Sequence, residues 1–96
     1  MYILITYDVD TTSRDGQRRL RHVSNACKDF GQRVQNSVFE CELSEAQLVL
    51  LQDRIGKIID HTLDSIRIYY LNKNSNRRIV VMGKETSYNL EEAIII

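Results

Sequence analysis

Asp8 is the residue of this chain that is best placed for chemistry. It follows an apolar run that begins at Tyr2, and Tyr7 and Asp10 flank it. Ligands often lie at the carboxyl end of a buried strand, and a carboxylate there can hold a hard divalent cation. One acid binds such an ion weakly, but a two-fold axis beside the strand end would bring two copies of Asp8 to one ion. An aspartate at a strand end is also a common turn or cap residue, so Asp8 alone does not decide between the two roles.

No other catalytic pattern stands out in the sequence. It has no glycine-rich phosphate loop and neither a GxSxG nor a HExxH motif. His22 and His61 are predicted to be surface or boundary residues. Cys27 and Cys41 are not spaced as a ligand pair, and we expect both to be reduced and buried. Any metal is therefore predicted to be held by carboxylate oxygens, with Mg²⁺ as the first candidate and Mn²⁺ as the alternative.

The formal net charge of zero conceals a segregation of charge along the chain. Residues 14–33 carry six Lys or Arg side chains and two acids, and residues 67–84 carry five Lys or Arg side chains and no acid. A chain sorted in this way can present a basic face to phosphates and still be neutral as a whole. Ordinary solvated helix and loop surface fits the same charge pattern equally well.

Hydrophobic periodicity predicts a short series of alternating elements. The first helix has apolar residues at helical spacing and a glycine that stops it. The second helix begins with a capping-box pattern. The predicted elements are strand 2–9, the helix that stops at Gly31, a strand or hairpin arm at 33–43 with a bulge or bend near Asn36 and Ser37, the helix after Ser44, strand 65–71 and strand 79–82.

These elements predict a single α+β domain, residues 1–96, with a ferredoxin-like β-α-β-β-α-β sandwich. Two helices cover only one face of such a sheet, so the other face is expected to need a partner. The C-terminal segment from about Asn89 to Ile96 ends in three isoleucines and is predicted to pair with a second copy. A tail folded back on its own core is the alternative. The lack of a spanning run and of a secretory signal predicts a cytoplasmic protein without membrane contact.

The first predicted helix is basic and amphipathic. Arg14, Arg18 and Arg21 fall on the face opposite the apolar residues. Arg19 differs, because it projects into the apolar arc of the helical wheel. Either its side chain snorkels to solvent, or it reaches past the core toward a ligand.

The chain also carries, in order, the segments TYDVDTTS, RRLRHV, GQRVQNSVFECEL and DSIRIYYL. In these segments it resembles the CRISPR-associated endonuclease family that forms the small second subunit of the spacer-acquisition machinery of antiviral defence. It looks more like the short members that accompany a type I array than like type II members. The resemblance covers nearly the whole chain, and RVQNSVFEC is its most specific part. It implies a ferredoxin-like homodimer whose C-terminal strand crosses to the partner protomer.

The resemblance also implies roles for individual residues. Asp8 matches the family's metal-binding aspartate at the dimer axis, and Tyr7 matches the tyrosine before it, so both are candidate catalytic residues. The candidate nucleic-acid-binding residues are the first-helix arginines Arg14, Arg18, Arg19 and Arg21, whose register against the family is open, and the pair that frames the second-strand motif, Arg33 and Phe39.

Two functions of different class remain open at this stage. The first is a magnesium-dependent endonuclease that hydrolyses phosphodiester bonds of RNA or double-stranded DNA as a homodimer. The second is a non-catalytic dimeric scaffold that binds duplex DNA for the integrase subunit. A toxin-like ribonuclease of similar fold is a third possibility. The sequence does not distinguish RNA from DNA as the substrate.

Overall fold

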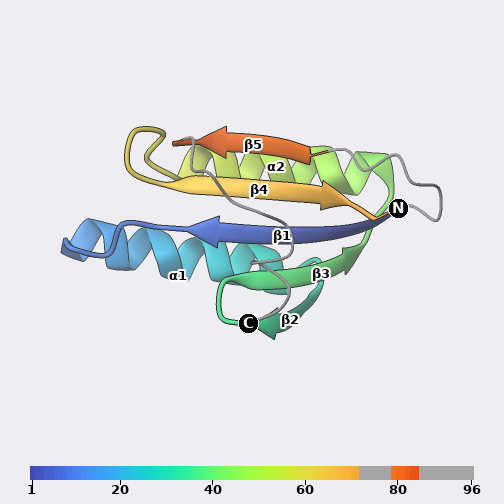
Figure 1. Ribbon diagram of the computed structural model, residues 1–96, viewed down its shortest axis with the longest axis horizontal. Coiled ribbons are helices and arrows are strands. Elements are labelled where there is room, and N and C mark those ends of the chain that lie inside the picture. The colour runs from blue at the N-terminus through green and yellow to red at the C-terminus, as the bar shows by residue number, and fades with distance from the viewer. Residues whose placement is uncertain (72–78, 85–96) are drawn as a thin grey trace.

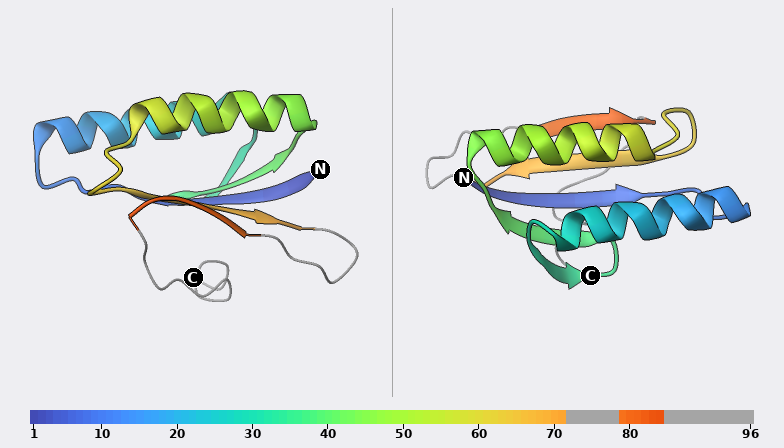
Figure 2. Two further views of the ribbon diagram at one scale, coloured as in Figure 1. Left: turned by 90° about the horizontal axis from the view of Figure 1, so that it is seen from above. Right: turned by 180° about the vertical axis from the view of Figure 1, so that it is seen from behind.

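The computed structural model describes residues 1–71 and 79–84, which form a five-stranded antiparallel sheet and two helices (Figure 1). The strand order is β2-β3-β1-β4-β5, so β1 is central. Both helices lie on one face of the sheet (Figure 2). The predicted α+β, ferredoxin-like arrangement is confirmed, and the strand predicted at 79–82 is the fifth strand of the sheet. In chain order the elements are β1 (Tyr2–Asp8), α1 (Arg14–Lys28), β2 (Gln32–Gln35), β3 (Val38–Glu42), α2 (Glu45–Ile58), β4 (Ser65–Tyr70) and β5 (Ile79–Gly83).

The central strand β1 is apolar on both faces because it is buried on both. It pairs with β3 on one side and with β4 on the other. Ile3 and Ile5 are fully buried in the core beneath the helices. Leu4 belongs to a smaller cluster with Val38 and Tyr69 on the opposite face. Because successive side chains of a strand point to opposite faces, this alternation fixes where the residues at the end of β1 point.

Helix α1 is anchored at both ends by local interactions. The Ser13 Oγ accepts a hydrogen bond from the Gly16 N–H at 3.0 Å, which makes Ser13 the N-cap. The helix ends at Lys28, before the predicted stop at Gly31. Phe30 therefore packs against the core from the loop that follows the helix. The predicted capping box of α2, between Ser44 and Gln47, is present.

The segment 33–43, predicted as a strand or hairpin arm with a bulge or bend near Asn36 and Ser37, is a two-stranded hairpin whose turn lies at those residues. Strands β2 and β3 pair antiparallel across a tight turn at residues 36–37. Ser37 adopts a left-handed backbone conformation, with φ of 64°. The reversal of the chain explains why the apolar residues change face within this segment. The pairing also shifts register between Arg33 and Gln35.

No described helix covers the face of the sheet that carries Leu4. The C-terminal segment 89–96, which we expect to pair with a second copy, lies outside the described residues, as do Lys73, Arg77 and Arg78. None of the described helices combines the length and the apolar character that a membrane crossing needs.

Candidate functional site

Asp8 lies at the end of β1 on the sheet face that no described helix covers. It is exposed, and among the described residues it forms no hydrogen bond or ion pair. Its register partner on β4 is Ser65, and Thr6 lies two residues back on the same face. The Oγ1 of Thr6 and the Oγ of Ser65 are buried and have no hydrogen-bond partner among the described residues. Asp8 is thus next to two hydroxyl oxygens that the described chain leaves without a partner.

Tyr7 points away from Asp8, into the layer between the sheet and the helices. Its side chain is 5% exposed, and its ring stacks on Phe39 with centroids 6.1 Å apart. Its backbone N–H donates to the carbonyl of Ser37 at 3.1 Å. The two residues that the sequence pairs as catalytic candidates therefore lie on opposite faces of the sheet. Tyr7 supports the strand end from beneath and does not face a ligand held by Asp8.

Arg33 and Phe39 are brought together by the pairing of β2 with β3. The Arg33 guanidinium lies over the Phe39 ring, 5.3 Å from its centroid, and Nη2 donates to the Ser24 Oγ at 2.5 Å. Phe39 itself is fully buried, and its contact with nucleic acid stays a prediction. Its ring fixes the orientation of the exposed Arg33 through a cation–π contact.

A buried acid, Asp64, anchors the loop that follows Asp8, and sequence reasoning did not single it out. Asp64 is fully buried and accepts a hydrogen bond from Arg19 Nε at 2.7 Å. It also accepts from the backbone N–H groups of Asp10, at 3.1 Å, and Asp60, at 2.8 Å. A buried charge is stable when it is paired and hydrogen-bonded in this way. The signal in the sequence was Arg19 itself, because an arginine in an apolar arc needs an acid partner.

Gly83 closes the same junction from the other side. The Lys84 N–H donates to the Asp64 carbonyl at 2.6 Å. Gly83 has φ of +82°, and a Cβ on it would lie 2.2 Å from the Asp64 oxygen. Only glycine fits there, because a side chain would be strained and would clash with the backbone. The loop after β1, helix α1 and the loop after α2 are thereby tied to the Asp64 carboxylate, and the end of β5 is tied to the backbone carbonyl of the same residue.

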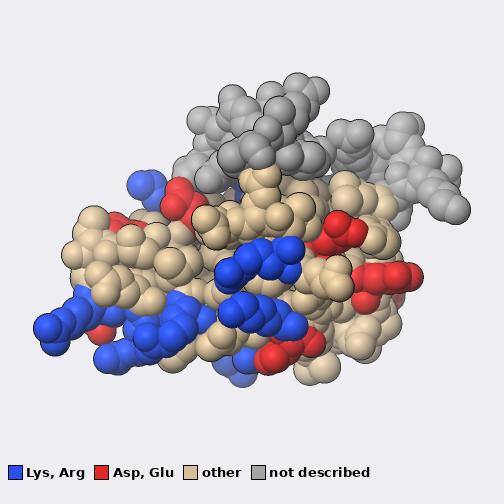
Figure 3. Space-filling view, turned by 90° about the horizontal axis from the view of Figure 1, so that it is seen from below, with Lys and Arg blue, Asp and Glu red and all other residues tan. Residues whose placement is uncertain are grey.

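The arginines on the outer face of α1 contrast with Arg19. Arg14, Arg18 and Arg21 are exposed, and none forms an ion pair among the described residues. Figure 3 shows Lys and Arg side chains (blue) gathered from the left end to the middle of the view. The largest group of Asp and Glu side chains (red) lies toward the right end. The charge segregation predicted from the sequence is therefore present on the folded surface.

The described residues of one chain do not form a metal centre. No group of three or more His, Cys, Asp or Glu side chains lies together among them. Cys27 and Cys41 are free and buried, and burial raises the pKa of the Cys27 thiol to about 12 and that of Cys41 to about 11. Both exposed histidines, His22 and His61, lie away from Asp8 in sequence and on the helix side. Asp8 is thus an exposed carboxylate at the end of β1 on the uncovered face, where Glu40 and Glu42 of β3 lie toward the other end of the strand.

Comparison with known proteins identifies the family. The family model described as CRISPR associated protein Cas2 matches residues 1–79. A Rhodospirillum rubrum protein named CRISPR-associated endoribonuclease Cas2 3 is 49% identical over 94 residues, 98% of this chain and 99% of that protein. A Halalkalibacterium halodurans protein named CRISPR-associated endonuclease Cas2 is 46% identical over 95 residues, 99% of each chain.

The solved structures agree with the sequence comparisons. The crystal structure of Streptococcus pyogenes Cas2 at pH 6.5 superposes with a TM-score of 0.71 and 54% identity, covering 77% of this chain and 89% of that one. The likeness thus extends to both sequence and fold, over most of each protein. The chain belongs to the CRISPR associated protein Cas2 family.

Proposed function

We propose that this protein is a metal-dependent endonuclease that hydrolyses phosphodiester bonds of nucleic acid as a homodimer, with Asp8 as the metal ligand. The observation that carries the proposal is the exposed Asp8 carboxylate beside the unpartnered hydroxyls of Thr6 and Ser65. Relatives at 46–49% identity are named endonuclease and endoribonuclease, which supports the same activity.

The donor atoms around Asp8 fit a hard divalent cation. The exposed Asp8 carboxylate is an oxygen ligand of the kind that Mg²⁺ and Mn²⁺ prefer, whereas the Thr6 and Ser65 hydroxyls beside it are buried. One chain supplies too few such ligands, and a second copy related by a two-fold axis at this face doubles the set. When bound, the cation stabilises charge on the scissile phosphate and lowers the pKa of a bound water. Asp8 would hold the ion at the strand end, and Asp64 keeps the following loop in place through the Asp10 N–H.

A second copy is the occupant that the uncovered face favours. The face carries the apolar cluster of Leu4, Val38 and Tyr69, and on β5 Ile79 and Val81 remain 48% and 40% exposed. Apolar side chains on a sheet face with no covering helix are stabilised by burial against another sheet. An active protein that sediments as a monomer at every concentration would contradict a dimeric site. The integrase subunit, the further partner that the family resemblance implies, stays a prediction.

The basic residues are assigned to the phosphate backbone. Arg14, Arg18, Arg21 and Arg33 are exposed cations, which bind nucleic acid through phosphates without reading sequence. Arg19 was a candidate for the same role, but its guanidinium is held by Asp64, so we assign it to the scaffold. Because the relatives' names include both endoribonuclease and endonuclease, single-stranded RNA and double-stranded DNA are both substrates to test.

The test is cleavage by purified wild type and Asp8→Ala with Mg²⁺, with Mn²⁺ and with chelator, on both substrates. Asp8→Ala changes both protomers of a dimer, so it removes both anchoring carboxylates at once. We expect cleavage to fall by orders of magnitude while binding in chelator is unchanged or tighter. Asp53→Asn, an exposed acid on α2 that pairs with Lys57, is the matched control and should cleave normally.

Two results would count against this assignment. Equal cleavage by wild type and Asp8→Ala would place the activity elsewhere or in a contaminant. No cleavage by either protein, with intact DNA binding, would favour the non-catalytic scaffold for the integrase subunit.

A further inference from the structure

A groove runs between α1 and the β2–β3 hairpin, on the helix side of the sheet. Its volume is about 500 Å³, and Tyr7 and Leu20 lie among its lining residues. Three cations line it as well, namely Arg21 and Lys28 from α1 and Arg33 from β2. No acidic residue lines it. The groove is therefore a concave surface of one charge sign, which attracts anions more strongly than a flat surface does.

The cations of this groove are free to bind a ligand. None of the three forms an ion pair among the described residues. Arg33 is also pre-oriented, because Phe39 lies beneath its guanidinium and the Ser24 Oγ accepts from its Nη2. A guanidinium that is already held in place loses less conformational entropy when it binds a phosphate.

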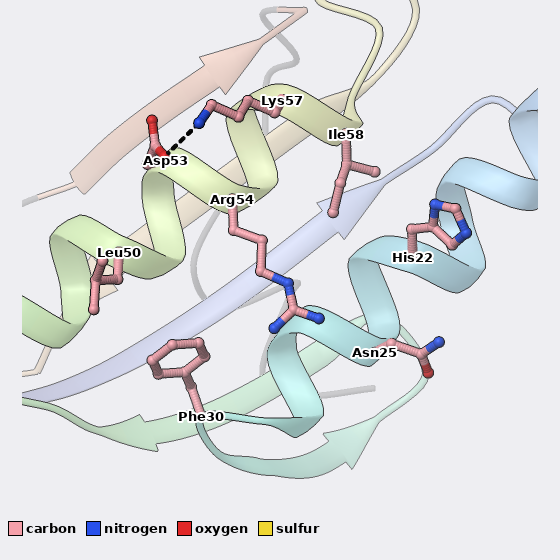
Figure 4. Close-up of a pocket in the computed structure, with 8 residues that line it drawn as sticks. All are labelled: His22, Asn25, Phe30, Leu50, Asp53, Arg54, Lys57 and Ile58. Carbon is pink, nitrogen blue, oxygen red and sulfur yellow. Dashed lines mark ion pairs between the residues drawn. The ribbon is translucent and has the colours of Figure 1, made fainter.

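The second groove beside α1 is an internal control. It lies between α1 and α2, has a volume of about 630 Å³, and also contains cations (Figure 4). There, however, Lys57 Nζ lies 3.0 Å from Asp53 Oδ2, and Arg54 Nη1 lies 2.6 Å from Asp29 Oδ2. Its positive charge is thus neutralised within the chain, whereas that of the hairpin groove is not.

Amide side chains stand next to the free cations. Asn25 on α1, which also borders the groove between the helices, and Asn36 in the hairpin turn both line the hairpin groove. An amide offers both a donor and an acceptor, the combination that pairs with the edge of a nucleobase. A duplex keeps its base edges in its own grooves, while an unpaired nucleotide presents both its phosphate and its base edge. Cations and amides side by side thus fit an unpaired nucleotide better than they fit a phosphate alone.

We propose that the hairpin groove binds one unpaired nucleotide of a nucleic-acid strand, with its phosphate at Lys28 and Arg33 and its base toward Asn25 and Asn36. The inference rests on the proposed function, because it takes the ligand to be nucleic acid. Tyr7, at the end of β1, lines the groove, and Asp8 follows it on the other face. The groove therefore holds a strand that passes the end of β1, outside the metal site.

The experiment measures fluorescence anisotropy of a short labelled single-stranded oligonucleotide in chelator, where cleavage plays no part. The double variant Lys28→Ala/Arg33→Ala should bind roughly tenfold or more weakly, because it loses hydrogen bonds to charged phosphates. The control Arg54→Ala/Lys57→Ala removes the same charge from the neutralised groove and should change affinity by about twofold or less. Asp53→Asn, which changes an exposed acid outside both proposed sites, should bind as the wild type does.

A second arm distinguishes a nucleotide from an anion. An abasic oligonucleotide of the same length should bind the wild type more weakly, and Asn25→Ala/Asn36→Ala should remove that difference. If Lys28→Ala/Arg33→Ala and Arg54→Ala/Lys57→Ala lost the same affinity for the oligonucleotide, net charge alone would explain the loss. That result would overturn the hairpin groove as a binding site. Equal affinity for the abasic and base-bearing strands on the wild type would overturn the nucleotide assignment. The two proposals fail separately. Cleavage by Asp8→Ala tests the metal site, whereas binding in chelator by the groove variants tests the hairpin groove.

Discussion

Asp8 and Asp64 are two aspartates at the same end of the sheet with opposite surroundings. Asp8 is exposed on the uncovered face, and Asp64 turns toward α1 and is fully buried. Asp64 accepts from Arg19 and from two backbone N–H groups, whereas Asp8 has no partner among the described residues. A carboxylate whose hydrogen bonds are all made inside the chain is part of the scaffold. One that is left free beside unpartnered hydroxyls is available to a ligand.

The largest expected effect is on stability, and it should separate these two carboxylates. Asp64→Ala should lower the free energy of unfolding by roughly 3–5 kcal/mol, because it removes one partner of a buried ion pair and leaves Arg19 without its acid. Asp8→Ala should cost about 1 kcal/mol or less, as exposed substitutions do. Urea denaturation of both variants measures the difference. Equal unfolding midpoints would show that Asp64 does not hold the scaffold together.

The same contrast extends to the arginines of α1. Arg14, Arg18 and Arg21 have no ion-pair partner, while Arg19 is held by Asp64. Replacing the first three with alanine should weaken binding to duplexes of any sequence. Each lost phosphate contact should reduce the slope of log affinity against log salt by roughly 0.9. A triple variant with unchanged affinity and slope would mean that these side chains are ordinary solvated surface.

A smaller effect is expected at the two loops that meet at Asp64. The Thr12 and Thr62 hydroxyls donate to Asp10 and Asp60 and lower the pKa of each carboxyl below its ordinary 3.8. A carboxyl with a lowered pKa in the folded state stabilises the fold above its ordinary pKa and loses that contribution as the pH falls below it. Thr12→Val/Thr62→Val should therefore be less stable than wild type near neutrality and equal to it in strong acid. Urea midpoints across the acid range measure this convergence, and a constant difference would contradict it.

The smallest effect concerns the buried thiols. Burial raises the pKa values of Cys27 and Cys41 to about 12 and about 11, so almost no thiolate is present at neutral pH. Because the thiolate is the reactive form, thiol reagents should modify the folded protein slowly and the urea-unfolded protein quickly. Mass spectrometry after timed alkylation measures both rates. Fast modification of the folded chain would show that this part of the core opens readily.

Much of the fold could be predicted from local patterns. The apolar run of β1, the capping box at Ser44 and the alternation of β4 each place an element correctly. The hairpin at 33–43 was only half predicted. Its turn uses a serine in a left-handed conformation, which no glycine or Asn-Gly pair announces in the sequence.

The sequence by itself determined which residues lie at the end of β1, because strand periodicity and the position of Asp8 are local properties. Only the tertiary structure decided what each charged residue does. It turned Tyr7 away from Asp8, buried Phe39 beneath Arg33, and joined Arg19 to an acid 45 positions along the chain. These roles depend on which segments meet in the folded chain. Burial and pairing arise from contacts between residues far apart in the sequence, and a local pattern does not encode such contacts.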